Sequence, residues 1–252
     1  MRSGHDRGVA ISVANVTTFL LPGTGSDDDY LRRALAGPLM QAGARVVNVT
    51  PRPQRLVAGY LEALDDALRS HPAGIAVGGV SIGAAVAAHW ALAHQDRTVA
   101  VLAVLPPWTG APGEAPASLS ARHTAATLRR EGLEATTAVM RSSSPGWLAD
   151  ELARSWRGQW PALPDAMDEA AEYVAPTAHE LSGLRVPLAV IGAPDDAIHP
   201  IGVAADWASW APRAALRTVR LAEFGPCPPL LGTACVDALQ ALNGTSQADR
   251  AP

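Results

Sequence analysis

The chain has 252 residues, of which 48% are hydrophobic, and a formal net charge of −4 with an isoelectric point near 6.0. This length supports one substantial core with a small inserted subdomain, and is too short for two full-sized domains with linkers. The basic residues form no long run, so a nucleic-acid-binding surface is not expected. Two cysteines, Cys227 and Cys235, are too few for a disulfide framework.

The start of the chain argues against export and membrane insertion. Residues 1–7 are polar, and the apolar stretch behind them is broken by polar side chains and ends at Pro22 and Gly23. Such a stretch makes a poor signal peptide and is too short to span a bilayer. We therefore expect a cytoplasmic protein with free thiols and no membrane partner, while the oligomeric state stays open.

Six short apolar runs predict β-strands, and longer segments of helical period lie between them. The strands are expected at residues 16–21, 45–49, 74–80, 99–105, 187–191 and 216–221. Helices are expected at 27–42, 56–68, 84–92 and 230–242, followed by a disordered polar tail at 243–252. This alternation indicates an α/β protein with a doubly wound, mostly parallel sheet, in which ligands bind beyond the carboxyl ends of the strands.

The alternation stops in residues 107–183, which contain no apolar strand pattern. Helices are expected there at 117–132, 145–156, 164–174 and 176–181. Because a long insertion in a compact domain is usually functional, we interpret residues 107–183 as a helical cap on a core formed by 1–106 and 184–252. The alternative is a set of helices at the sheet edge without a substrate role.

A glycine-flanked serine follows the third predicted strand. Residues 79–83 read Gly-Val-Ser-Ile-Gly, between an apolar strand and an alanine-rich helix. In such a turn the serine has a strained backbone, and small flanking residues avoid collision with the neighbouring strand and helix. The turn would place the Ser81 hydroxyl at a helix N-terminus, where free N–H groups favour a developing oxyanion. A glycine-rich turn with a solvent-facing serine is the alternative.

With this turn in its strand–helix context, the chain resembles the α/β-hydrolase superfamily, in particular its small single-domain members with a helical cap. The resemblance covers most of residues 16–243 and implies a serine nucleophile at Ser81. It also implies an oxyanion loop after the first strand, here residues 21–26, with Pro22 where the family often has histidine.

The oxyanion loop has candidate donors by position. The resemblance assigns oxyanion binding to the backbone N–H groups of Thr24 and Ile82, with Gly23 in the same loop. Both donors are backbone N–H groups, so they are present even though Pro22 replaces the family's histidine. An ordinary turn capped by Ser26 is the alternative.

The family's triad carboxylate lies in an Asp-x-(Ile/Val)-x-Pro stretch after the penultimate strand. Residues 196–200 fit this stretch and make Asp196 the acid, with Asp195 as the fallback. The acid fixes the tautomer of a histidine and stabilises its cation. Alternatively, both aspartates form a turn and cap the following helix.

The family's histidine follows the last strand, but Pro226 stands at that place here, and no histidine follows His199. His199 lies on the loop nearest the expected position and is therefore the candidate base. His123 in the cap and Cys227 are further alternatives, whereas His89, His94 and His179 are typical of packing or surface positions.

Two functions follow from these residues. The first is a serine hydrolase acting on a carboxylic ester or thioester through an acyl-enzyme at Ser81. The second is a catalytically degenerate member of the fold that binds a hydrophobic small molecule, because a serine without a base is a weak nucleophile.

Tryptophans indicate the kind of ligand. Trp108 follows the fourth strand, and Trp147, Trp156 and Trp160 lie in the cap. With the apolar cap they favour an uncharged acyl or aromatic ester, in which Trp108 contacts the substrate. Zinc-ligand spacing, a P-loop and a dinucleotide fingerprint are absent from the sequence, so we expect neither a metal nor a cofactor.

Overall fold

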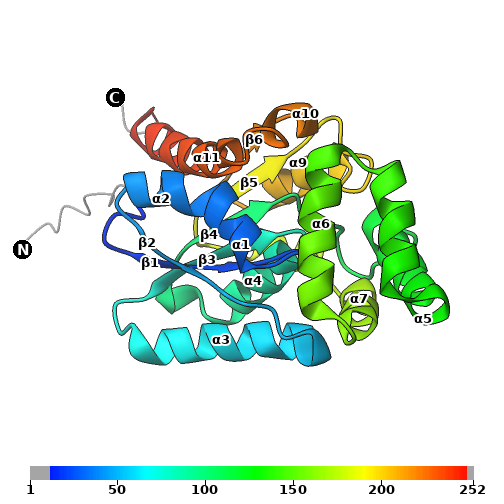
Figure 1. The fold of residues 1–252 in the computed structure, drawn as a ribbon. Helices are drawn as coiled ribbons and strands as arrows, with labels where there is room; N and C mark the ends of the chain where they lie inside the picture. The colour runs from blue at the N-terminus through cyan, green and yellow to red at the C-terminus, as the bar shows by residue number, and fades with distance from the viewer. Residues whose placement is uncertain (1–11, 249–252) are drawn as a thin grey trace, which may run out of the picture.

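The computed structural model describes residues 12–248, so the polar segment 1–7 and the last four residues of the expected tail lie outside the description. Six parallel strands form one sheet in the order β2-β1-β3-β4-β5-β6 (Figure 1). They are β1 (Thr17–Leu21), β2 (Arg45–Asn48), β3 (Ile75–Val80), β4 (Thr98–Val104), β5 (Leu188–Gly192) and β6 (Ala214–Thr218). The predicted doubly wound α/β architecture is confirmed.

The four central strands, β1, β3, β4 and β5, are almost wholly buried because both faces of the sheet are covered there. In β1, Phe19 and Leu21 belong to the core on one face, while Leu20 belongs to the core on the other. The first face carries α3 (Leu56–Ser70), α4 (Ile82–Ala93) and α9 (Ile201–Trp210). The second face carries α1 (Asp28–Leu31), α2 (Gly37–Gln41), α10 (Leu221–Phe224) and α11 (Pro229–Ala248). This two-sided burial explains the continuous hydrophobic runs from which the strands were predicted.

Among the elements predicted for the core, three differ clearly from the structure. The expected strand at 216–221 is β6 at Ala214–Thr218, because Leu221 already begins α10. The expected helix at 27–42 is divided by a π-helical segment, Arg32–Ala36. The prediction of a disordered tail from residue 243 is wrong up to Ala248, because α11 extends that far. Lengthening an existing helix by a few residues requires no new nucleation step.

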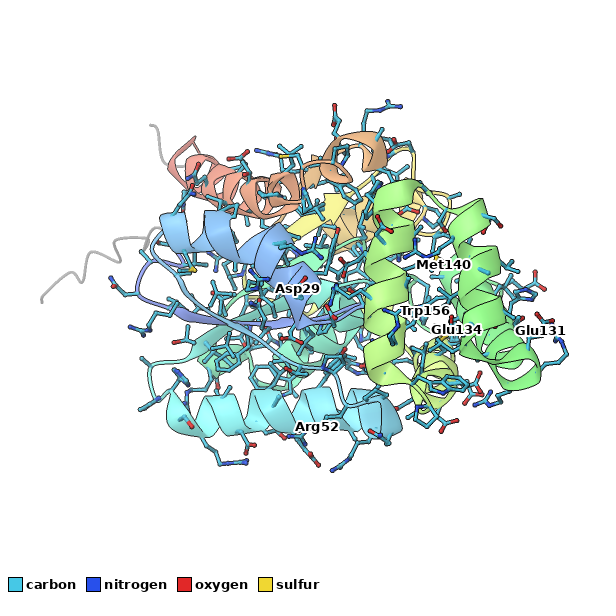
Figure 2. All side chains as sticks on the ribbon, viewed as in Figure 1. Asp29, Arg52, Glu131, Glu134, Met140 and Trp156 are labelled. Atoms are coloured by element: carbon cyan, nitrogen blue, oxygen red, sulfur yellow. The ribbon has the colours of Figure 1, made fainter. Side chains whose placement is uncertain are left out.

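Four helices lie between β4 and β5, and within the described part of residues 107–183 there is no strand. They are α5 (Pro116–Ser143, interrupted at Gly132), α6 (Gly146–Gln159), α7 (Leu163–Glu172) and α8 (Ala178–Ser182). Figure 1 shows α5, α6 and α7 stacked on one side of the sheet, with α6 nearest to α1. In Figure 2, Trp156 lies on α6, whereas Glu131 lies at the outer edge of this helical layer.

The helical layer is joined to the core at α3 by one carboxylate. Glu169 of α7 accepts hydrogen bonds from the N–H groups of Leu56 and Val57, at 2.7 and 3.1 Å. These N–H groups belong to the first turn of α3, which has no intrahelical acceptor for them. From residue 12 to residue 248, none of the helices is both long enough and apolar enough to cross a membrane.

We predict that Gly83→Ala destabilises the protein by roughly 1–3 kcal/mol or more, because a Cβ there would overlap the Leu21 carbonyl oxygen at the end of β1. Urea denaturation followed by circular dichroism measures the effect. Gly202→Ala is the control, because Gly202 has open space around it, and its free energy of unfolding should change by no more than about 1 kcal/mol. Equal effects of the two substitutions would contradict the packing explanation.

Candidate active site

Ser81 occupies a strained turn between β3 and α4. Its backbone has φ 54° and ψ −119°, a left-handed φ that costs a non-glycine residue about 1–3 kcal/mol. Neighbouring main-chain hydrogen bonds hold the turn: Ser81 N donates to Val104 O at 2.9 Å, and Ala85 N donates to Ser81 O at 3.1 Å. The serine is 8% exposed, so its hydroxyl lies in a nearly closed site.

The loop after β5 brings two further predicted residues to this serine. His199 Nε2 lies 2.9 Å from Ser81 Oγ, and His199 Nδ1 lies 2.8 Å from Asp196 Oδ2. The His199 and Asp196 side chains are 16% and 7% exposed. In this arrangement an Nδ1–H donates to the carboxylate and leaves Nε2 free to accept the serine proton. The structure therefore places Ser81, His199 and Asp196 in one hydrogen-bonded row.

Asp196 is held as a carboxylate by its own turn. Its Oδ1 accepts hydrogen bonds from Ile198 N at 2.8 Å and from His199 N at 3.2 Å. Burial alone would raise the pKa of Asp196, but the hydrogen bond and the charge of His199, together with the two amides, lower this pKa below its usual 3.8. An ionised carboxylate is the form that can stabilise a histidine cation.

Asp195, the fallback acid, has a different set of contacts. Its carboxylate accepts hydrogen bonds from Leu221 N at 2.6 Å and Ala222 N at 3.3 Å, at the start of α10. It therefore ties the loop that carries Asp196 and His199 to the segment after β6. The same contact explains why a helix begins at Leu221, where a strand was predicted to continue.

The other candidate bases do not meet Ser81 in the described structure. His89 Nδ1 contacts Tyr173 Oη at 3.1 Å, His94 contacts the Trp90 carbonyl at 2.8 Å, and His123 is exposed on α5. Both cysteines are free thiols, with Cys227 exposed and Cys235 buried. Pro226 is exposed, and the preceding Gly225 is covered by the indole of Trp147 from α6.

The oxyanion loop, residues 21–26, lies directly against the serine. A Cβ on Gly23 would be 3.5 Å from the Ser81 Cβ, and the buried Tyr60 hydroxyl donates to Pro22 O at 3.2 Å. Thr24 N donates no hydrogen bond within the described residues. Ile82 N begins α4, where N–H groups have no intrahelical acceptor. Both amides are thus available to a ligand oxygen, as the predicted role requires.

Trp108 is a core residue in this structure. It is 5% exposed, and its indole N–H donates to Tyr173 O at 3.1 Å. Since the polar edge of Trp108 is already paired, only its ring is left for a substrate. The predicted substrate contact of Trp108 stays a prediction.

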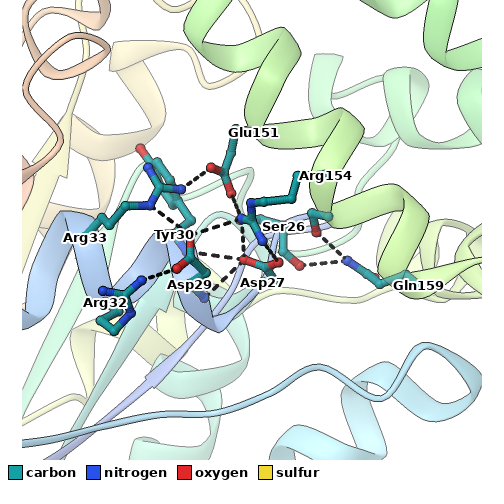
Figure 3. A network of polar contacts seen from close by, with 10 residues as sticks. Ser26, Asp27, Asp29, Tyr30, Arg32, Arg33, Glu151, Arg154 and Gln159 are labelled. Carbon is teal, nitrogen blue, oxygen red and sulfur yellow. Dashed lines mark hydrogen bonds and ion pairs between the residues drawn. The ribbon is translucent and has the colours of Figure 1, made fainter.

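An ion-pair network that the sequence did not reveal joins α6 to α1 (Figure 3). Arg154 of α6 pairs with Asp27 at 2.6 and 2.9 Å and with Glu151 at 2.5 Å. Arg33 pairs with Glu151 and, at 2.8 Å, with Asp29. The carboxylates of Asp27, Asp29 and Glu151 lie close enough together to hold a cation, but these arginines neutralise them. The network therefore serves to hold the helical layer beside the oxyanion loop.

Known structures resemble this fold over nearly its full length. A carboxylesterase structure from Nitrososphaera gargenis has a TM-score of 0.71 at 14% identity, covering 92% of both chains. A hydrolase from Oleispira antarctica has a TM-score of 0.66 at 13% identity, covering 93% of this chain and 92% of the other. The enol-lactonase from Burkholderia xenovorans LB400 has a TM-score of 0.62 at 19% identity, covering 92% and 90%.

Sequence comparisons add no closer relative: no family model matches the chain, and no curated protein matches it either. At identities this low, structural likeness establishes the fold alone. The fold is clear, because the sheet order, the helices and the structural neighbours agree. The chain has the α/β-hydrolase fold.

We predict that Asp196→Asn lowers the free energy of unfolding more at pH 6 than at pH 3. A carboxylate with a lowered pKa stabilises the folded state above its unfolded pKa, and this contribution disappears as the pH falls through the lower folded value. Denaturant titrations of the native protein and the variant between pH 3 and pH 6 measure the difference. A difference that does not vary with pH would contradict the stabilised carboxylate.

Proposed function

We propose that the protein is a serine hydrolase that cleaves a carboxylic ester or thioester through an acyl-enzyme at Ser81. The observation that carries this proposal is the position of His199, within hydrogen-bond distance of both Ser81 Oγ and Asp196 Oδ2. A serine is activated when an adjacent base accepts its proton and a third group orients that base.

The reaction follows from these contacts. Ser81 Oγ attacks the acyl carbon while His199 Nε2 takes the serine proton, and the carbonyl oxygen becomes an oxyanion that the Thr24 and Ile82 amides bind. Asp196 stabilises the resulting histidine cation. As the intermediate collapses, His199 gives the proton to the departing alcohol or thiol. Water then attacks the acyl-enzyme as His199 takes its proton, and His199 returns that proton to Ser81 Oγ as the ester bond breaks and the carboxylic acid is released.

The substrate we propose is an uncharged small molecule with an acyl or aromatic ester, covered by the helical cap. The low exposure of Ser81 and the closeness of α6 to the oxyanion loop favour a substrate that is enclosed during reaction. The structural neighbours support hydrolysis in general, since they include a carboxylesterase and an enol-lactonase.

The second candidate is a degenerate member of the fold that binds a hydrophobic small molecule without cleaving it. The observation in its favour is Pro226, which stands where the family's histidine is expected. Against it stand the contact of His199 with Ser81 and the strained backbone of Ser81, for which a pure binder has no use.

We predict that a fluorophosphonate probe labels Ser81 in the native protein. Ser81→Ala should abolish labelling, and His199→Ala should slow it by at least about a thousandfold, because the hydroxyl then loses its base. In-gel fluorescence over time and mass spectrometry of the labelled peptide measure both effects.

His123→Ala is the matched control for this experiment, because His123 is exposed on α5 and should label at the native rate. Absence of labelling of the folded native protein between pH 6 and pH 9 would favour the degenerate binder. Equal labelling rates in His199→Ala and the native protein would remove His199 from the mechanism.

Two adjacent aspartates allow a matched test of the acid. We predict that Asp196→Asn lowers kcat about ten-thousandfold, because an amide neither holds the required histidine tautomer nor stabilises its cation. Asp195→Asn should lower kcat by at most about tenfold, since Asp195 contacts main-chain amides of α10. Hydrolysis of p-nitrophenyl butanoate by both variants measures the difference. A larger loss in Asp195→Asn would reverse the assignment.

A further inference from the structure

Three buried polar atoms at the junction of α6 with the oxyanion loop make no hydrogen bond to any described residue. They are Ser26 Oγ, Trp156 Nε1 and Gln159 Oε1. The Trp156 and Gln159 side chains are 4% and 7% exposed, so solvent at the surface does not reach these atoms. Buried polar groups are nearly always paired, because an unpaired group loses its hydration without replacement. Three unpaired atoms at one junction therefore point to a missing hydrogen-bonding group.

This junction adjoins the proposed oxyanion site. The indole of Trp156 lies on Gly25, where a Cβ would be 2.7 Å from Trp156 Nε1. Gly25 directly follows Thr24, and Gly23 lies against Ser81. The unpaired atoms therefore border the same short loop that borders the serine.

The orientation of Gln159 is fixed by two hydrogen bonds. Its Nε2 donates to Ser26 O at 2.9 Å and to Ser155 Oγ at 2.8 Å (Figure 3). The side-chain oxygen is therefore left as an acceptor, while the indole of Trp156 is a donor only. Together with the Ser26 hydroxyl, the junction offers one donor, one acceptor and one group that can be either.

The charged residues beside the junction are already paired with one another. Arg154 contacts Asp27 and Glu151, and Arg33 contacts Glu151. A carboxylate or ammonium group on a ligand would therefore find no free countercharge there, and burying it unpaired is costly. The junction suits an uncharged group that both accepts and donates a hydrogen bond. An alcohol hydroxyl has this chemistry.

We propose that Trp156 and Gln159 form a subsite for a hydroxyl group of the substrate, which accepts from the indole N–H and donates to the glutamine oxygen. This inference rests on the proposed function of Ser81 and adds a substrate class, hydroxylated esters, to it.

Three esters test the subsite: ethyl butanoate, ethyl 3-hydroxybutanoate with the hydroxyl on the acyl side, and 2-hydroxyethyl butanoate with it on the alcohol side. We expect one hydroxylated ester to exceed ethyl butanoate in kcat/KM by about tenfold in pH-stat assays. Trp156→Phe keeps an aromatic ring but removes the N–H, and should reduce this ratio about tenfold. Trp160→Phe, at a residue 40% exposed, is the control and should keep the native ratio.

The subsite is wrong if neither hydroxylated ester is preferred, or if Trp156→Phe keeps the native preference. A water molecule that fills the junction would give that result. Calorimetric titration of Ser81→Ala with the same esters separates this inference from hydrolysis itself. Tighter binding of a hydroxylated ester, lost in Ser81→Ala/Trp156→Phe, supports the subsite even where the native protein cleaves no ester. Cleavage without preference overturns the subsite and leaves the hydrolase standing.

Discussion

The Leu21 carbonyl approaches Gly79 and Gly83 so closely that neither position has room for a side chain. A Cβ on either glycine would overlap that oxygen, so the end of β1 and the turn at Ser81 fit together only without side chains there. The fit sets the oxyanion loop beside the serine and leaves Gly23 against it. The position of α6, which rests on that loop, depends in turn on the same contact.

The contact between His199 and Asp196 is made within one short turn. Acid and base usually come from separate loops, which the tertiary structure must align. Here Asp196 accepts hydrogen bonds from the amides of Ile198 and His199 with one oxygen and contacts the imidazole with the other, so one short turn fixes the imidazole to its carboxylate. The contact of this turn with Ser81, by contrast, joins residues that are far apart in the sequence. Asp195 contributes to it by joining the loop to α10.

The sequence predicted those features that short segments encode. Buried strands produce continuous apolar runs, the serine turn requires flanking glycines, and the Asp196 stretch carries its own spacing. The sixth strand was placed too late because β6 is a half-exposed edge with little apolar signal, and because Asp195 starts a helix at Leu221. The pairing of Arg154 with Asp27 joins residues 127 positions apart, and the burial of Trp156 on Gly25 spans a similar distance. No local pattern encodes such contacts.

The segment after β6 and the helical layer pack against each other through α6. The family's base would follow Gly225, but in this chain Trp147 of α6 covers that glycine and meets the Phe224 ring edge-on, with ring centroids 5.9 Å apart. At its other end, α6 places Trp156 on Gly25 of the oxyanion loop. One helix thus rests on glycines of two segments, the loop at residues 21–26 and the segment after β6. The position of α6 is therefore set by contacts with both segments, while His199 reaches Ser81 from the loop after β5.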